Sequence, residues 1–372
     1  MTLGSSGARP VGAGLRLPLV ALNVFLLVAA VLAGLQRMGW SIAWPPVHFA
    51  AYHGPLMVVM FFGALIALER AVALGRLVFY AAPVLMAAAG VVWLFGAPLW
   101  VVQWLALAGA LVFALVAWAM VRSHRALYTE TMGIGIVTFT VGTALWVLGH
   151  PMSRVIWWWV AFFVLTIAGE RLELGRLTGA AQRFGHLFRW GLLLSLGGLL
   201  LAELWPSVGV RVYALGTLAL GVWLLKYDIA RFTIRQPGLP RFAAACLLSG
   251  YFWLILGAAV IVVQGFVQGG LLYDAALHAV MLGFVFAMVF GHAPIIFPAL
   301  LGLPIRFHPA LYAPLALLHA SLLWRFVADL LNSPLGRRWA GMLNAISIAL
   351  YFGVMMVVRV VDVLRARRGS AA

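Results

Sequence analysis

The sequence predicts an all-α, polytopic membrane protein with twelve transmembrane helices in a single domain, residues 1–372. Two features of composition point to this class: 65% of the 372 residues are hydrophobic and only 9% are charged. A soluble globular chain is usually about 25% charged, so this composition excludes that class. The third feature is the grouping of the apolar residues into stretches of about 20, the length that crosses the hydrocarbon core of a bilayer.

Twelve apolar stretches are long enough to span a membrane. They are residues 17–36, 46–68, 77–95, 98–121, 128–149, 154–170, 187–205, 208–226, 242–264, 271–292, 309–331 and 340–363. The first stretch is too long for a typical cleaved signal peptide, so we expect it to be a spanning helix. No loop between the stretches is long enough to fold as a soluble domain.

The basic residues predict the orientation. With a cytoplasmic N-terminus, 19 of the 25 basic residues, Arg9 and Arg16 among them, lie on the cytoplasmic side. Six lie outside: Arg37, Arg154, Arg211, Arg325, Arg337 and Arg338. This split predicts that both termini are cytoplasmic, in the inner (cytoplasmic) membrane of a prokaryote. The net charge of +16 then reflects the basic residues that orient the helices in the membrane, and we expect the lipid bilayer rather than nucleic acid as the partner.

The tryptophans 157–159 are expected in the outer aromatic belt.

Short echoes along the chain suggest an internal repeat. The phrase ERAVALGRL begins at Glu69, and ERLELGRL begins at Glu170, four helices later. Another four helices on, the tenth stretch contains HAVML from His278, which echoes HGPLM from His53. This period predicts pseudo-threefold packing of four-helix repeats; chance similarity in an Ala-, Leu-, Gly- and Arg-rich chain is the alternative. Each glutamate precedes an arginine, where a local ion pair is expected.

Two histidines are the first candidates for a cofactor site, because ionisable side chains within a bilayer are costly and usually functional. His53 and His278 lie at similar distances from the outer start of their stretches, which places both about 10 Å below the outer surface. Two imidazoles at one depth on neighbouring helices can ligate one haem iron from opposite faces. Gly54 and Ala279 beside them would leave room for a flat macrocycle. The alternative is two unrelated histidines, each hydrogen-bonded within the bundle.

His48 and His319 are second-rank candidates. His48 precedes His53 by five residues, about 140° around a helix, so the two are poorly placed to share a metal. We expect His48 either to cap the same site or to lie in the interface. His319, in the middle of the eleventh stretch, either faces a cavity or packs within the bundle.

His292 is the third second-rank candidate. It follows His278 by fourteen residues, about 21 Å deeper, so it cannot share that iron. We expect Pro294 and Pro298 to break the helix here and His292 to ligate a separate centre, because broken helices within membranes often line sites.

Copper and a proton path are further candidates. Met57 and Met281 follow the paired histidines at helical spacing, and thioethers suit Cu(I). Filling gaps in the core is their alternative role. Glu130, near the inner end of the fifth stretch, either begins a proton path or anchors the helix end against Arg125.

The helical plan, with histidines on the second and tenth helices, resembles subunit I of the haem-copper oxidases. It also resembles the NnrS family, twelve-helix haem- and copper-containing proteins linked to nitric oxide metabolism. HGPLM at His53 and the segment from His278 to His292 look like diverged versions of its histidine motifs. The resemblance implies a b-type haem with His53 and His278 as axial ligands, copper as a second metal, nitric oxide as a gaseous ligand, and a respiratory or other electron-donor protein as partner.

The sequence also departs from the oxidase pattern. The sixth and seventh stretches contain no histidine, whereas an oxidase places its copper ligands there. The histidines of the tenth stretch are also fourteen residues apart rather than nearly adjacent. An oxygen-reducing binuclear centre therefore cannot be carried over to this chain.

Three functions follow as expectations. The first is a haem protein, a membrane haem oxidoreductase if it is an enzyme, acting in nitric oxide-related or respiratory electron-transfer chemistry. The second is a secondary transporter, because twelve helices with internal repeats also suit that class. The third is a non-catalytic respiratory subunit or assembly factor. The chain has no Walker loop, HExxH helix or CxxC motif, so nothing supports an ATPase, metallopeptidase or thioredoxin-like function.

Overall fold

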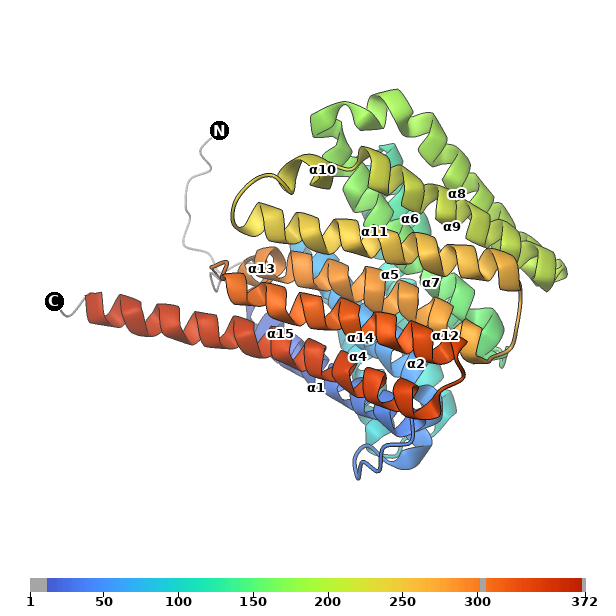
Figure 1. Ribbon diagram of the computed structural model, residues 1–372, viewed down its shortest axis with the longest axis horizontal. Helices are drawn as coiled ribbons and strands as arrows, with labels where there is room; N and C mark the ends of the chain where they lie inside the picture. The colour runs from blue at the N-terminus through green and yellow to red at the C-terminus, as the bar shows by residue number, and fades with distance from the viewer. Residues whose placement is uncertain (1–11, 302–305, 370–372) are drawn as a thin grey trace.

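A computed structural model of the chain confirms the all-α membrane class (Figure 1). It describes residues 12–301 and 306–369. Within these residues there is no strand, and twelve helices are long and apolar enough to cross a membrane. Arg9, which the charge analysis assigned to the cytoplasmic tail, lies outside the described residues.

Several spans are built from more than one helical segment, with 3₁₀ and π segments labelled η. In chain order the elements are α1 (Ala13–Arg37), η1 (Val47–Tyr52), α2 (His53–Pro55), η2 (Leu56–Gly63), α3 (Ala64–Leu74), η3 (Leu77–Tyr80), α4 (Ala81–Leu94), α5 (Leu99–Ser123), α6 (Leu127–Val147), α7 (Met152–Leu174), η4 (Gly175–Thr178), α8 (Ala180–Leu204), α9 (Pro206–Tyr227), α10 (Ala230–Thr233), α11 (Leu239–Gln264), α12 (Leu271–His278), η5 (Ala279–Phe286), α13 (Ala287–Leu301), η6 (Pro309–Leu311), α14 (Tyr312–Leu330) and α15 (Pro334–Gly369).

The twelve spans coincide with the twelve predicted stretches, but some helices run further. The seventh span begins at Ala180 rather than at residue 187, and the sixth continues to Thr178. These extensions carry basic residues such as Arg183, which is exposed. A hydropathy pattern detects only the hydrocarbon-buried part of a helix, whereas arginine can continue the helix while keeping its charge in water.

Peripheral spans turn large apolar side chains outward. Along α5, Trp100, Trp104, Leu111, Leu115 and Trp118 are all more than half exposed. A patch of this kind on a soluble surface would be an aggregation site. On a chain of spanning helices, it is the surface that contacts the lipid bilayer.

Three spans form the centre of the bundle, and they recur at the four-helix interval. The most apolar windows of the second, sixth and tenth spans are 67%, 89% and 67% buried, whereas every other described span has 56% or less. The three meet through phenylalanine rings: Phe62 lies 5.1 Å from Phe163 and 5.2 Å from Phe286, centroid to centroid. Phe62 and Phe163 are separated by the same number of residues as Glu69 and Glu170.

The expectation of an aromatic belt at Trp157–Trp159 was wrong. All three side chains are less than 10% exposed, and Trp159 is completely buried. The sixth span is central, so its outer end is surrounded by protein rather than by lipid headgroups. Trp158 instead donates its indole N–H to the Glu203 carboxylate at 2.9 Å.

The expected helix break at Pro294 and Pro298 was also wrong, because α13 continues through both prolines. A proline removes the hydrogen bond to the carbonyl four residues earlier, which for Pro294 is the carbonyl of Phe290. The Tyr351 hydroxyl of α15 donates to that carbonyl oxygen at 2.5 Å, and its ring stacks on Phe290 at 3.9 Å. A neighbouring helix thus satisfies the carbonyl and keeps α13 intact.

The α8–α9 hairpin gives a test of close helix packing. The two helices lie side by side at one edge of the bundle (Figure 1). A Cβ at Gly198 would fall on the backbone nitrogen of Tyr213, whereas a Cβ at Gly197 meets nothing within 4 Å. We expect Gly198→Ala to lower stability by about 1–3 kcal/mol through overpacking. Gly197→Ala should leave stability unchanged or raise it, because alanine is the better helix former. Thermal unfolding of both variants in detergent checks this, and equal behaviour would contradict it.

Candidate functional site

The two paired histidines lie at matching places in two central spans. His53 begins the short helix α2, which passes directly into the π-helix η2. His278 ends α12, and the π-helix η5 follows it directly. Each π segment has eight residues. Because π-helical geometry is rare and concentrates at functional sites, its presence after both histidines marks this level of the bundle.

Backbone carbonyls hold each neutral imidazole in one tautomer. Nδ1 of His53 lies 2.6 Å from the carbonyl oxygen of Ala30 in α1, and Nδ1 of His278 lies 2.8 Å from that of Asp274. A carbonyl oxygen only accepts, so each Nδ1 must donate its hydrogen, and Nε2 of the neutral ring carries the free lone pair. None of the hydrogen bonds among the described residues uses either Nε2. Metal-bound histidines are oriented in this way.

The two histidines share one charged environment. They are close enough to interact electrostatically with each other and with the same two neighbours, Asp274 and Arg325. The side chain of His278 is 20% exposed although it belongs to a central span, so it borders open space. The space beside Gly54, the residue after His53, is also open, because a Cβ added there would meet no atom within 4 Å.

A charge network surrounds His278. The Asp274 carboxylate accepts hydrogen bonds from Arg325 at 2.7 Å and from Arg337 at 3.3 Å, and Arg337 also pairs with Asp329. Arg325 and Arg337 were predicted only as charges on the outer side, not as part of a site. The four-residue spacing from Asp274 to His278 places both on one helix face and could have revealed this one contact of the network.

The second-rank histidines lie elsewhere. His48 is exposed in η1 against the ring of Phe49. Nδ1 of His319 accepts the indole N–H of Trp253 at 2.9 Å. Its hydrogen is therefore on Nε2, which makes neutral His319 a packing residue rather than a metal ligand.

The copper and proton-path candidates lie on three different elements. Met57 is buried in η2, and Met281 is half-buried in η5. Glu130 lies in the first turn of α6 and pairs with the exposed Arg125 at 3.0 Å, the anchoring alternative. Among the described residues, no group of three or more His, Cys, Asp or Glu side chains could hold a metal ion.

His292 lines a separate cavity of about 120 Å³ among the three central spans, α1 and α15. Glu69 and Glu170 also line it, as do Asn23 and Thr166. Asn23 Oδ1 and Thr166 Oγ1 are buried without a hydrogen-bond partner in the described part of the chain. Unsatisfied polar atoms of this kind are costly, so they mark a place where a water or a ligand supplies the missing bonds.

The local ion pairs expected at the two glutamates were wrong. Glu170 pairs with Arg70 of the second span rather than with Arg171 beside it. Arg171 instead binds the buried carboxylate of Asp228 with two hydrogen bonds, at 2.7 and 3.0 Å. Adjacent helical residues point about 100° apart, so partners on neighbouring helices are better placed.

Comparison with known proteins adds one finding. A family model described as "Domain of unknown function (DUF8744)" matches residues 16–360. No curated protein matches the chain.

Proposed function

The chain belongs to this DUF8744 family, and we propose that it is an integral membrane haem protein in which His53 and His278 are the axial ligands. One observation carries the proposal: two neighbouring imidazoles in central spans have Nδ1 anchored to backbone carbonyls and Nε2 free. Haem iron in a bis-histidine site takes its two protein ligands from such nitrogens. No third protein ligand is needed, because the macrocycle supplies the other four.

The neighbouring residues fit this group. Open space beside Gly54 and the accessible surface of His278 provide an edge along which a macrocycle can enter. Arg37 is exposed, interacts electrostatically with His53 and has no ion pair among the described residues, so it suits a haem carboxylate. The phenylalanines below, Phe62 and Phe286, keep the inner side apolar and dry.

The ligand set favours electron transfer. A haem held by two histidines supplies one-electron redox chemistry and has no vacant coordination position for a gas. The roles of this chain's residues are to fix both imidazoles and to exclude water. A respiratory or other electron-donor protein is then the partner, and nitric oxide chemistry requires displacement of one histidine. Copper, with Met57 and Met281 as ligands, is a subordinate part of the proposal.

The first test is the absorption spectrum of the purified protein. We expect a Soret band and the sharp visible bands of low-spin iron on reduction, with a pyridine haemochrome of b type. Protein purified from haem-replete cells without any Soret band would refute the proposal.

Gly34 gives a second test, because the His53 ring packs against it. An added Cβ would lie 2.8 Å from Cε1 and 2.9 Å from Nδ1 of His53. Gly34→Ala should therefore displace the imidazole from the Ala30 carbonyl and weaken haem retention by about 10–100-fold, as when a ligand's supporting bond is lost. Gly353→Ala is the matched control, since a Cβ there meets nothing within 4 Å. Equal haem retention in both variants would show that this packing is irrelevant.

We also place the protein in the cytoplasmic membrane of a prokaryote with both termini inside, on the 19-to-6 division of basic residues. A reporter fused after Ala372 that is active only in the periplasm would overturn this orientation.

The cavity at His292 favours a second candidate function, secondary transport of a small organic cation. Glu69 makes no hydrogen bond or ion pair with any described residue, and the nearby free atoms on Asn23 and Thr166 include acceptors. A protonated amine would satisfy them. Butylammonium should then raise the unfolding temperature of the native protein but not of Glu69→Gln, while Glu173→Gln, an exposed neighbour, keeps the effect. The absence of stabilisation in all three would remove this candidate.

A further inference from the structure

We propose that the pocket formed by the end of α9, α10 and α11 binds the phosphate headgroup of an anionic phospholipid. The pocket has a volume of about 690 Å³. Its lining includes three cations, Lys226, Arg231 and Arg235, and three aliphatic side chains, Leu225, Ile234 and Leu248. This inference is independent of the haem proposal, because no residue is shared.

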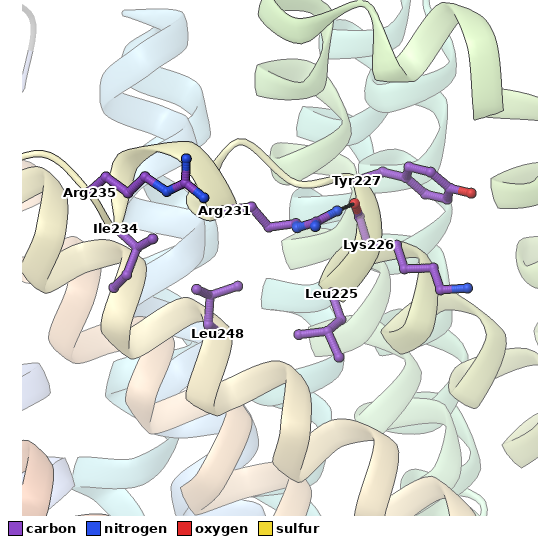
Figure 2. Close-up of a pocket in the computed structure, with 7 residues that line it drawn as sticks. All are labelled: Leu225, Lys226, Tyr227, Arg231, Ile234, Arg235 and Leu248. Carbon is purple, nitrogen blue, oxygen red and sulfur yellow. Dashed lines mark hydrogen bonds between the residues drawn. The ribbon is translucent and has the colours of Figure 1, made fainter.

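The two kinds of side chain occupy different sides of the pocket. Figure 2 shows Arg235, Arg231 and Lys226 along one rim, with Leu225 and Leu248 below them toward the spanning parts of α9 and α11. A phospholipid has the same order of chemistry, a charged headgroup followed by apolar chains. Basic pockets beside spanning helices bind such headgroups.

No described residue neutralises the positive charge of this rim. Asp228 is the only acidic residue between Leu225 and Leu239. Its side chain is completely buried and held by Arg171, so it cannot reach the pocket. None of the three cations forms an ion pair with a described residue.

The rim is also held in place. Asp228 Oδ1 accepts the backbone N–H of Ala230 at 2.6 Å, which fixes the start of α10. Arg231 donates from Nη1 to the carbonyl oxygen of Lys226 at 2.6 Å, the bond drawn in Figure 2. A guanidinium has five N–H donors, so Arg231 and Arg235 keep donors for phosphate oxygens. Part of the ordering of this site therefore precedes ligand binding.

The apolar floor selects a lipid rather than a free anion. Inorganic phosphate would satisfy the cations but leave the aliphatic side chains uncovered. Phe232, next to Arg231, is 60% exposed, and Leu225 is 38% exposed. At a membrane interface, these side chains are covered by acyl chains, which phosphate lacks.

The test is native mass spectrometry of full-length protein reconstituted in phosphatidylcholine vesicles with or without phosphatidylglycerol, then released into mild detergent. We expect bound phosphatidylglycerol on the unmodified protein and about tenfold less on Lys226→Gln/Arg231→Gln/Arg235→Gln, because each cation near an anionic headgroup contributes to retention. The control Arg125→Gln/Arg183→Gln/Arg189→Gln removes the same charge from exposed residues elsewhere and should retain the lipid.

A second variant, Leu248→Trp, keeps every charge and fills the floor, so it should also lose the lipid even if the triple variant folds poorly. Equal retention in the triple variant and its control, or equal loss in both, would overturn the proposal. So would thermal stabilisation by inorganic phosphate that equals that by phosphatidylglycerol, since the site would then recognise a soluble anion.

Discussion

Replacing either His53 or His278 by alanine is expected to convert a low-spin haem into a high-spin or weakly retained one. A backbone carbonyl holds each imidazole in place, so the remaining histidine cannot take the position of the one that is removed. Loss of one ligand leaves five-coordinate iron, and the Soret band should shift and weaken. The effects of the two substitutions should be non-additive in the double variant, because both ligands belong to one centre.

Three other histidines provide the controls. His186→Ala changes an exposed residue and should leave the spectrum intact. His319→Ala removes a partner of Trp253 and should affect stability rather than spin state. His292→Ala should remove part of the haem or metal signal and leave the His53/His278 centre intact if the cavity lined by His292 holds a second centre. If His53→Ala and His278→Ala both kept a full low-spin haem, the axial pairing would be wrong.

Breaking the buried Arg171–Asp228 pair is expected to give the largest loss of stability. The Arg171 side chain is 5% exposed and that of Asp228 is 0% exposed. Asp228→Asn keeps the acceptor for the Ala230 N–H but leaves the guanidinium charge without its counterion. Removing one partner of a buried pair costs about 3–5 kcal/mol, and we expect a loss of this size as a fall in the unfolding temperature in detergent.

Two comparisons separate the ion pair from other effects of the substitution. Arg171→Met combined with Asp228→Asn should recover part of the lost stability, because no uncompensated charge remains buried. Glu130→Gln breaks the pair with Arg125, whose side chain is 85% exposed, and should have almost no effect. A full-size loss in the Glu130 variant, or none in Asp228→Asn, would show that burial does not govern these pairs.

The sequence determined the features that depend on local composition. Apolar runs of bilayer length placed all twelve spans, because a spanning helix satisfies its own backbone hydrogen bonds and needs only an apolar exterior. Counting residues along two helices also predicted that His53 and His278 lie at one depth, and both lie in short helices that pass directly into a π-helical segment. The helix ends were less well placed, since arginines such as Arg183 continue a helix that hydropathy treats as finished.

Only the tertiary structure decided which surface each residue meets. A tryptophan at a helix end fits a lipid interface equally well in any span, but Trp159 lies in a central one and is buried by protein. Pro294 predicted a break that Tyr351, more than fifty residues away, prevents by bonding the Phe290 carbonyl. Glu170 forms its ion pair with Arg70 rather than with its sequence neighbour Arg171. In each case the deciding partner is on another helix, and neither hydropathy nor helical spacing carries information about which helices are adjacent.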